Sequence, residues 1–235
     1  MLRRDFLASS AAVGLSLRCA SQVVARQPQQ TSTASRVPKL NPPQNGPIPV
    51  AYAISRHCTW IDWVGPQAVF ETWHFDHTLK RHSPRFKQFT VSERREPVDS
   101  LIPDYTFETA PLAKIVVVPA QMGSPALHEW LRAVQKTADV TMSVCIGARH
   151  LATAGLLDGQ RATTHHGAID QFMRKFPKVQ WVRGVRFVEG EKVSTAGGLT
   201  AGIDLALRVV ERYFGRASAQ DVADHLEYQS RGWIV

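Results

Sequence analysis

Cysteine is scarce in this chain. The 235 residues include three cysteines, at positions 19, 58 and 145, too few for a disulfide scaffold. Long apolar runs are missing as well, because no stretch approaches the roughly 18 to 20 residues of a membrane-spanning helix. We therefore expect no membrane insertion of the mature chain. With 44% hydrophobic and 20% charged residues, the composition is that of one good-sized globular domain.

Clusters of basic residues are missing too. The chain has 28 Lys and Arg against 20 Asp and Glu, a net charge of +8, but the basic residues are scattered rather than stacked along one helix. This pattern is typical of a solubilising surface and not of a nucleic-acid footprint. No helix-turn-helix segment follows the expected domain. We therefore expect no nucleic-acid partner.

The first 25 residues have the features of an export signal. Paired arginines at positions 3 and 4 precede a mildly apolar stretch at 7–17, and a small residue, Ala25, ends the segment. Paired arginines before such a stretch indicate the twin-arginine route, so the protein is expected in the periplasm or otherwise outside the cytoplasm. An ordinary basic amphipathic N-terminus is the alternative. Lipid anchoring at Cys19 is not expected, because an arginine precedes it where a small residue is needed.

Residues 26–47 are rich in Pro, Gln and Ser and poor in large apolar groups. Such a segment cannot bury enough surface to offset its ordering entropy, so we expect a disordered linker. The remaining residues, 48–235, form the predicted domain.

Strands alternate with helices in this domain. The patterns predict strands at residues 48–54, 86–91, 115–118, 140–144, 162–166, 179–182 and 185–188. They predict helices at residues 60–73, 125–138, 148–154, 169–176, 200–214 and 217–229, with Pro66 tolerated only near a helix beginning,. This alternation predicts an α/β fold, a three-layer αβα sandwich with a mostly parallel, doubly wound sheet. Sites in such sheets form at the carboxyl ends of strands.

The stretch around Cys145 is the most informative. A buried apolar strand precedes it, Gly147 follows two residues later, and residues 148–154 are compatible with a helix. This order is typical of a nucleophile elbow, a sharp turn that exposes a reactive side chain. The helix N-terminus would then lower the thiol pKa below about 8.5. Alternatively, Cys145 is a small buried hydrophobe, as most free cysteines are.

Several segments resemble one superfamily. Ser143-Val-Cys-Ile-Gly-Ala and residues 154–166, Ala-Gly-Leu-Leu-Asp-Gly-Gln-Arg-Ala-Thr-Thr-His-His, are similar to the nucleophile region of the PfpI protease and isonitrile hydratase superfamily, within the class I glutamine amidotransferase-like fold. Residues 61–70, 103–107 and 194–207 resemble further parts of it. The similarity covers about 48–230. It implies the fold and, because members are commonly dimeric, a homodimer. Members include hydratases, glyoxalase-like and peptidase-like proteins, and regulator domains.

The resemblance also implies that Asp62 reaches the sulfur of Cys145. A carboxyl and a thiol that share one proton would supply both a nucleophile and a general acid. Alternatively, Asp62 is a carboxylate that complements the dipole of its own helix.

The chain departs from the superfamily pattern beside the cysteine. Isonitrile hydratases usually have threonine after the cysteine, where this chain has Ile146, and the histidine of peptidase-like members is absent. The Pro-Gly-Gly loop, whose N–H groups help to form an oxyanion-type pocket, is Pro-Ala-Gln-Met-Gly at 119–123. The candidate pocket residues are Ile146, Gly147, Ala120, Gln121, Gly123, Thr195 and Gly197. The glycines after Thr195 favour close backbone packing against the Cys145 turn.

The histidines give weaker signals. His165 and His166 lie near the same sheet edge, where one could contact the pocket, although an interior or surface role is the alternative. His57, Cys58 and His165 lack the spacing of metal ligands, so we expect no metal and no other cofactor. Residues 74–77, His-Phe-Asp-His, are interpreted as an exposed helix end.

These patterns favour an exported, cofactor-free enzyme that hydrates or hydrolyses a small molecule, with Cys145 as nucleophile and Asp62 as proton donor and acceptor. A cysteine redox or ligand sensor is one alternative. A catalytically silent binding domain of the same fold is another.

Overall fold

Apolar, largely β-branched strands form the centre of the domain. The computed structural model describes residues 37–72, 74–76, 81–83 and 85–235. Its seven-stranded sheet has the order β10-β11-β7-β6-β1-β4-β5. The strands of this sheet are β1 (Ile48–Ala53), β4 (Phe86–Ser92), β5 (Tyr105–Thr106), β6 (Ile115–Val118), β7 (Val140–Ser143), β10 (Phe187–Val188) and β11 (Val193–Ala196). All neighbours pair in parallel except β10 and β11. The predicted α/β fold with a mostly parallel sheet is confirmed.

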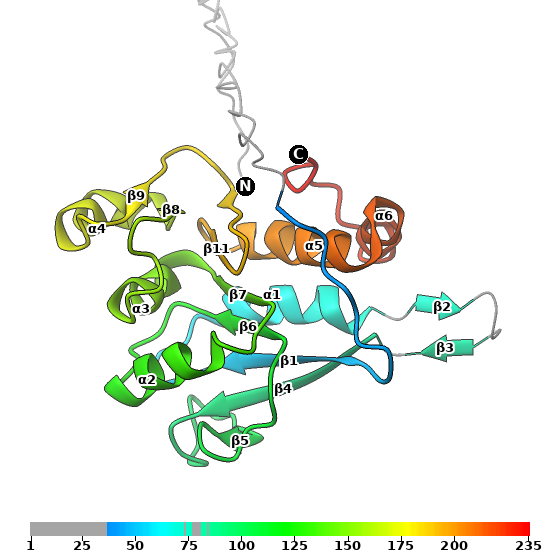
Figure 1. Cartoon of the computed structure of the whole chain (residues 1–235), viewed down its shortest axis with the longest axis horizontal. Helices are drawn as coiled ribbons and strands as arrows, with labels where there is room; N and C mark the ends of the chain where they lie inside the picture. Colours follow the sequence, from blue (N-terminus) through cyan, green and yellow to red (C-terminus); the bar gives the residue numbers. More distant parts are fainter. Residues whose placement is uncertain (1–36, 73, 77–80, 84) are drawn as a thin grey trace, which may run out of the picture.

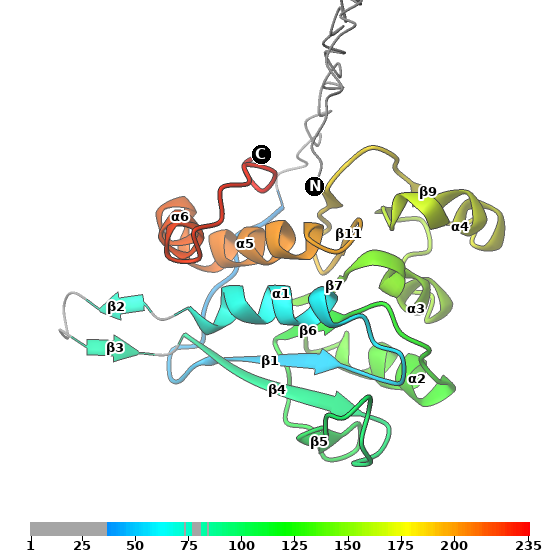
Figure 2. The same ribbon diagram turned by 180° about the vertical axis from the view of Figure 1, so that it is seen from behind.

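Helices cover both faces of this sheet (Figures 1 and 2). They are α1 (Trp60–Glu71), α2 (Pro125–Val134), α3 (Ala148–Thr153), α4 (Ile169–Lys175), α5 (Ala201–Phe214) and α6 (Arg216–His225). One apolar core contains residues of α1, α5 and α6, and a second core contains residues of α2, α3 and α4. Two cores separated by one sheet are the three layers that the sequence predicts.

Strand β1 lies where the direction of winding changes. Its neighbours are β4 on one side and β6 on the other. The helix after β1, α1, packs on one face, whereas the helix after β6, α2, packs on the opposite face. The loops that follow β1 and β6 therefore diverge. Crevices for ligands form at such switch points in parallel sheets.

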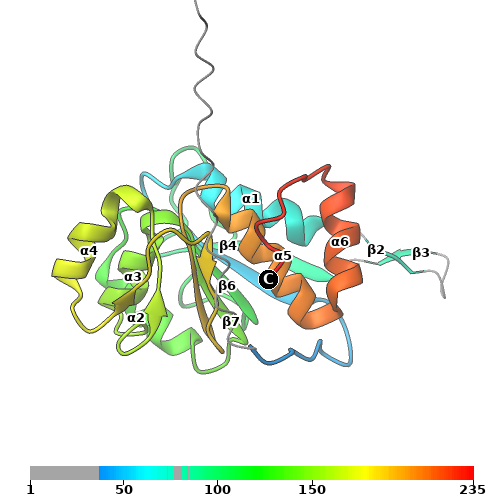
Figure 3. The same cartoon turned by 90° about the horizontal axis from the view of Figure 1, so that it is seen from above.

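Two short strand pairs lie outside this sheet. Strands β2 (His74–Asp76) and β3 (Arg81–Ser83) form an antiparallel pair that projects beyond the end of α1 (Figure 3). The prediction of a helix end at 74–77 is therefore wrong for residues 74–76, and His77 lies outside the described residues. Strands β8 (Arg161–Ala162) and β9 (Gln180–Trp181) pair in parallel, shorter than the strands predicted there.

Helix α1 continues through Pro66, which lies in its middle and not at its beginning. Proline has no N–H for the bond to the carbonyl four residues earlier, here that of Asp62, and normally weakens a helix interior. Packing compensates for this loss, because Val69 and Phe70 are buried in the core and α1 lies directly against α5. Gly202 of α5 packs closely on the end of the sheet, since a methyl group there would lie 2.8 Å from Cγ2 of Val144.

The segment before the domain is held against it in part. The N–H of Leu40 donates to the carbonyl oxygen of Arg212, and the Arg212 guanidinium donates to the carbonyl oxygen of Pro38. Residues 38–40 therefore lie on α5, although the composition predicts a free linker through residue 47. The expected signal at 1–25, Cys19 and the linker up to residue 36 lie outside the described residues. None of the helices in the described part of the chain is long and apolar enough to cross a bilayer.

Candidate active site

Cys145 occupies a strained turn between β7 and α3. Its φ is +57°, the left-handed region in which a non-glycine residue is uncommon, particularly away from Asn and Asp. Cys145 is the first residue of a short 3-10 turn, η1 (Cys145–Gly147), which leads into α3. The N–H of Cys145 donates to the carbonyl oxygen of Gly197 at 2.7 Å, and its carbonyl oxygen accepts from the hydroxyl of Thr164. Strain held in place by such bonds is frequent at functional sites.

Gly147 allows this turn to lie directly on the end of β6. A methyl group at position 147 would be 2.2 Å from the carbonyl oxygen of Val118. That oxygen already accepts a hydrogen bond from the N–H of Val144. Gly147 is therefore required by close packing of backbone on backbone, and its own N–H is bonded to the Val144 carbonyl oxygen. It contributes neither a side chain nor a free donor to a pocket.

The Cys145 thiol is more enclosed than the sequence predicts. Cys145 is 8% exposed, and its pKa is raised, first by burial and second by the nearby charge of Asp62. The backbone N–H groups of Ile146 and Leu199 act on the sulfur against this shift without reversing it. The predictions of an exposed sulfur and a lowered pKa are therefore wrong. A helix of six residues adds little stabilisation against the cost of burying a thiolate.

Asp62 is the carboxyl group that lies close to this thiol. It is fully buried on the first turn of α1. Its Oδ2 accepts the N–H of Ala120 at 3.0 Å, while its Oδ1 is buried without a hydrogen-bond partner among the described residues. Burial raises the Asp62 pKa to about 6, against the lowering effect of the Ala120 bond. A buried carboxyl with one free oxygen can accept and return a proton at near-neutral pH.

A second thiol also lies close to Asp62. Burial, Asp62 and Asp99 together raise the pKa of Cys58 to about 12. The N–H of Cys58 donates to Oδ2 of Asp99, which holds the turn before α1. This thiol is therefore protonated at physiological pH and is a poor nucleophile.

The loop after β6 uses its backbone donors inside the protein. The N–H of Ala120 goes to Asp62, and that of Gly123 goes to the hydroxyl of Ser55 at 2.9 Å. The Gln121 side chain points back to β1, where its amide donates to the carbonyl oxygen of Ala53. The N–H groups of Ala120 and Gly123 are therefore not free to bind an oxyanion, and the Gln121 side chain is held away from it. The N–H groups that do face the reactive atom are those of Ile146 and Leu199.

His150 of α3 supports the same loop, and sequence analysis missed it. The ring is 1% exposed. Its Nε2 lies 3.2 Å from the carbonyl oxygen of Gln121, and its Nδ1 lies 3.1 Å from Nε2 of His128. A methyl group at position 123 would lie 2.2 Å from the His150 ring, so Gly123 is needed for contact. Arg149 adds bonds to the carbonyl oxygens of Gln121 and Met122.

The remaining predicted residues have structural contacts. The hydroxyl of Thr195 accepts the N–H of Thr163 at 2.7 Å, inside the sheet. Gly197 holds the backbone of Cys145, which agrees with the predicted packing role. His165 accepts the N–H of Gly167 through Nδ1 and lies against Gly198. Its ring packs on the exposed ring of His166.

A cavity of about 250 Å³ lies behind the Cys145 turn, between Thr164 and Gly198. Its two arginines, Arg183 and Arg186, are ion-paired with Asp170 and Asp204, so their charges are already compensated. Within the described residues, no cluster of three or more His, Cys, Asp or Glu side chains is placed to hold a metal ion.

A parallel α/β sheet with a strained cysteine after a central strand defines a protein of the nucleophile-elbow type. Residues 90–212 match the DJ-1/PfpI family, and the chain belongs to this family. The resemblance to the PfpI and isonitrile hydratase superfamily is thereby confirmed at the level of the family.

Relatives of known name fall into two classes. Isonitrile hydratase of Pseudomonas putida is 36% identical over 136 residues, which cover 54% of this chain and 58% of the hydratase. The HTH-type transcriptional regulator CdhR of Pseudomonas aeruginosa is also 36% identical, over 106 residues that cover 45% of this chain and 31% of the regulator. The matches thus span less than two thirds of either relative.

Solved structures show the same fold. A THiJ/PfpI family protein from Pseudomonas syringae superposes with a TM-score of 0.66 and 23% identity, over 89% of this chain and 85% of that chain. An AraC family transcriptional regulator from Pseudomonas putida gives a TM-score of 0.65 and 19% identity, over 77% of this chain and all of that chain.

Proposed function

We propose that this protein is a cysteine-dependent hydratase or hydrolase of a small electrophilic molecule, with Cys145 as nucleophile and Asp62 as the group that moves the proton. The observation that carries the proposal is the pairing of a thiol on a strained turn with a nearby buried carboxyl whose Oδ1 has no hydrogen-bond partner among the described residues. The similarity to isonitrile hydratase supports it.

The raised pKa values define the resting state. With the Asp62 pKa at about 6 and that of Cys145 raised, the carboxyl is mostly ionised near pH 7 while the thiol keeps its proton. The pair therefore holds one proton, which sits on sulfur. A carboxylate in this position acts as general base as the sulfur attacks.

For hydration, the proposed reaction adds one water to the substrate in two steps; for hydrolysis of an amide, the carbon–nitrogen bond also breaks in the first step and the amine leaves with the proton from Asp62. In the first, sulfur bonds to the electrophilic carbon while the thiol proton passes to Asp62 and from Asp62 to the substrate. In the second, water attacks the same carbon, the carbon–sulfur bond breaks, and a water proton returns to sulfur. The N–H groups of Ile146 and Leu199 limit the cost of negative charge on sulfur during both steps.

Assays with isonitriles, α-oxoaldehydes and small amides as substrates would test the proposed roles of Cys145 and Asp62. We expect turnover of at least one class, reduced by about 10² or more in Cys145→Ala and Asp62→Asn. Cys58→Ala is the matched control and should retain activity. The rate should rise with pH through about 6 in the wild type, as Asp62 ionises. Equal activity in wild type and Cys145→Ala would reject the proposal.

A ligand-sensing domain without turnover is the second candidate. The enclosure of the thiol and its raised pKa favour it, as does the similarity to transcriptional regulators such as CdhR. Saturable ligand binding that survives Cys145→Ala, with no product from any substrate class, would support this candidate over the enzyme.

Export and dimer formation are also proposed. The sequence of residues 1–25 supports twin-arginine export, which the variant Arg3→Lys with Arg4→Lys should block in a cell-fractionation experiment. The exposed apolar side chains of Trp60, Ile61 and Val64 on α1 support a homodimer through this helix. Trp60→Ser with Val64→Ser should then shift the protein to a monomer in sedimentation analysis, without loss of fold.

A further inference from the structure

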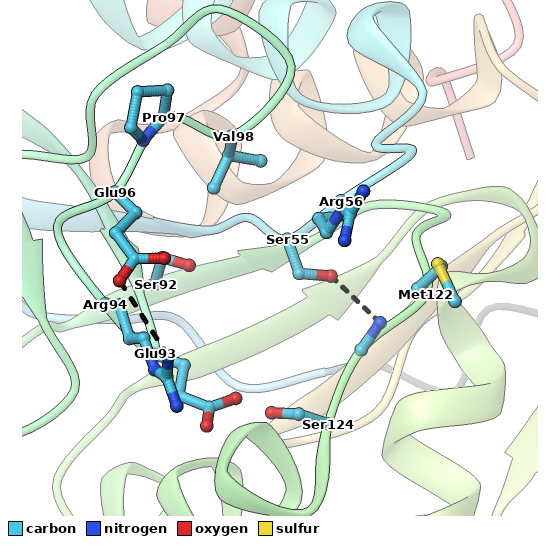
Figure 4. A pocket seen from close by; sticks show the side chains of 11 residues that line it. Ser55, Arg56, Ser92, Glu93, Arg94, Glu96, Pro97, Val98, Met122 and Ser124 are labelled. Atoms are coloured by element: carbon cyan, nitrogen blue, oxygen red, sulfur yellow. Dashed lines mark hydrogen bonds and ion pairs between the residues drawn. The ribbon is translucent and has the colours of Figure 1, made fainter.

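A second hollow opens at the switch point of the sheet, on the outer side of the loop that contacts Asp62. It has a volume of about 400 Å³, within the size range of small-molecule sites,. Its walls come from the segments after β1, β4 and β6 (Figure 4). The residues that line it include Ser55, Arg56, Glu93, Arg94, Met122 and Ser124. Neither Cys145 nor Asp62 lines this pocket.

One part of the pocket is rich in free donors. Arg56 is exposed, and its guanidinium has no ion pair or hydrogen bond within the described residues. The hydroxyl oxygens of Ser55 and Ser124 accept the N–H groups of Gly123 and Leu127. Because these oxygens act as acceptors, both hydroxyl protons remain available for a ligand. Ser55 lies beside Arg56, whereas Ser124 lies on the Glu93 side of the pocket (Figure 4). A guanidinium with a neighbouring hydroxyl donor is the chemistry that binds a carboxylate.

Another part of the pocket is acidic. Glu93 is exposed, and its carboxylate is also without an ion pair in the described part of the chain. Arg94, by contrast, is paired with Glu96 at 3.8 Å, so it adds little net charge. Arg56 and Glu93 come from different loops around the pocket, as Figure 4 shows. Glu93 would repel a ligand with two negative charges, whereas it would attract the protonated amine of a ligand that carries one.

We propose that this pocket binds a small zwitterion of the amino-acid type, with its carboxylate on Arg56 and Ser55 and its amino group near Glu93. Apolar walls at Val98 and Met122 leave room for a short aliphatic side chain. The inference goes beyond the proposed function and holds whether or not Cys145 turns over a substrate.

Calorimetric titration of the full chain with matched probes tests this site. One set is L-valine, isovalerate and isobutylamine, and the smaller set is glycine, acetate and methylamine. Each set contains a zwitterion and two probes that keep only one of its charges. We expect saturable binding of at least one zwitterion, at least tenfold tighter than the single-charge probes of its set.

Single substitutions test which side chain binds each charge of the ligand. Arg56→Gln should weaken the zwitterion and its carboxylate analogue at least tenfold, while Glu93→Gln should weaken the zwitterion and leave the carboxylate analogue unchanged. Both side chains are exposed, so the variants should fold, which circular dichroism checks. Arg174→Gln, on the exposed part of α4, is the matched charge control and should not change binding.

Three outcomes would overturn the proposal. They are no saturable binding of either zwitterion, binding that is unchanged by Arg56→Gln, and a carboxylate analogue that binds as tightly as its zwitterion. Cys145→Ala separates this site from the proposed active site. The variant should lose turnover and keep zwitterion binding, and loss of binding in Cys145→Ala would place the ligand at the thiol and reject the pocket.

Discussion

The Nε2 atom of His150 lies 3.2 Å from the carbonyl oxygen of Gln121. A carbonyl oxygen only accepts, so Nε2 carries the proton in this bond, and Nδ1 of the neutral ring accepts from Nε2 of His128,. A buried neutral imidazole therefore donates a hydrogen bond to the loop whose Ala120 N–H binds Asp62.

His150→Leu should lower the free energy of unfolding by about 1–3 kcal/mol, because it removes two buried hydrogen bonds and leaves the Gln121 carbonyl to Arg149 alone. Chemical denaturation measures the change. His225→Leu, at the exposed end of α6, is the control and should lie within about 0.5 kcal/mol of wild type. An equal effect in both variants would show that the bond to Gln121 contributes nothing.

Asp62 and His150 should affect stability against pH in opposite directions. The Asp62 pKa is raised from 3.8 to about 6, so its contribution is full below about 3.8 and is lost as pH rises through 6. The His150 pKa is lowered from 6.5 to about 4 by burial, so its contribution is full above 6.5 and is lost as pH falls through 4. Each pKa shift corresponds to a change of about 3 kcal/mol in the free energy of unfolding.

Asp62→Asn should therefore reveal the acid sensitivity of His150. Denaturation midpoints of this variant should fall between pH 6.5 and 4 more steeply than those of wild type, and the variant should be more stable than wild type at pH 7. The His128 pKa is lowered as well, which adds to the slope. If the wild type and Asp62→Asn curves are parallel from pH 4 to 7, the buried carboxyl does not have the raised pKa described above.

The left-handed backbone of Cys145 predicts that glycine is more stable than alanine at this position, the reverse of the usual order. At φ of +57° an alanine has a steric cost that glycine does not, so Cys145→Gly should be more stable than Cys145→Ala by about 1 kcal/mol. Cys58, a buried cysteine outside the left-handed region, is the control. There, Cys58→Gly should be less stable than Cys58→Ala. The same order at both positions would contradict the strained turn.

Gly147→Ala should be among the most damaging small substitutions in the protein. The added methyl group would lie 2.2 Å from the Val118 carbonyl oxygen, which must move away from the end of β6, and we expect a loss of more than about 3 kcal/mol. Gly159→Ala is the comparison, since it has φ of +73° but no atom within 4 Å of the new methyl group. It should cost about 1 kcal/mol. Thermal unfolding of both variants measures the difference.

Local patterns predicted the fold and the position of the cysteine turn. The apolar run Ile-Val-Val-Val at 115–118 is a buried strand, and Gly147 marks the turn because the backbone needs the space. Asp62 is buried on the first turn of a helix, and its charge acts on the Cys145 thiol, in line with the resemblance, which places it near the sulfur. These features depend on short stretches of sequence, where periodicity and steric limits act.

The state of the thiol could not be predicted in this way. Its pKa depends on how completely other segments cover it, and one of its two donors, Leu199, is 54 residues away in the chain. His150 was missed because a single histidine in a helix has no pattern that indicates its partner. The free donors at Ala120 and Gly123 were predicted from a loop alone, whereas Asp62 and Ser55 from other segments occupy them.

The hydrogen bonds from the Gly197–Leu199 segment to Cys145 have a consequence for synthesis of the chain. The backbone N–H of Cys145 is held by Gly197, and the N–H of Leu199 acts on its sulfur. During translation the turn emerges from the ribosome well before either partner, so a nascent polypeptide carries an ordinary thiol there. The enclosure and the raised pKa of this thiol are acquired only as residues 193–199 join the sheet, so an alkylating reagent should modify position 145 faster in a partly made chain than in the folded domain.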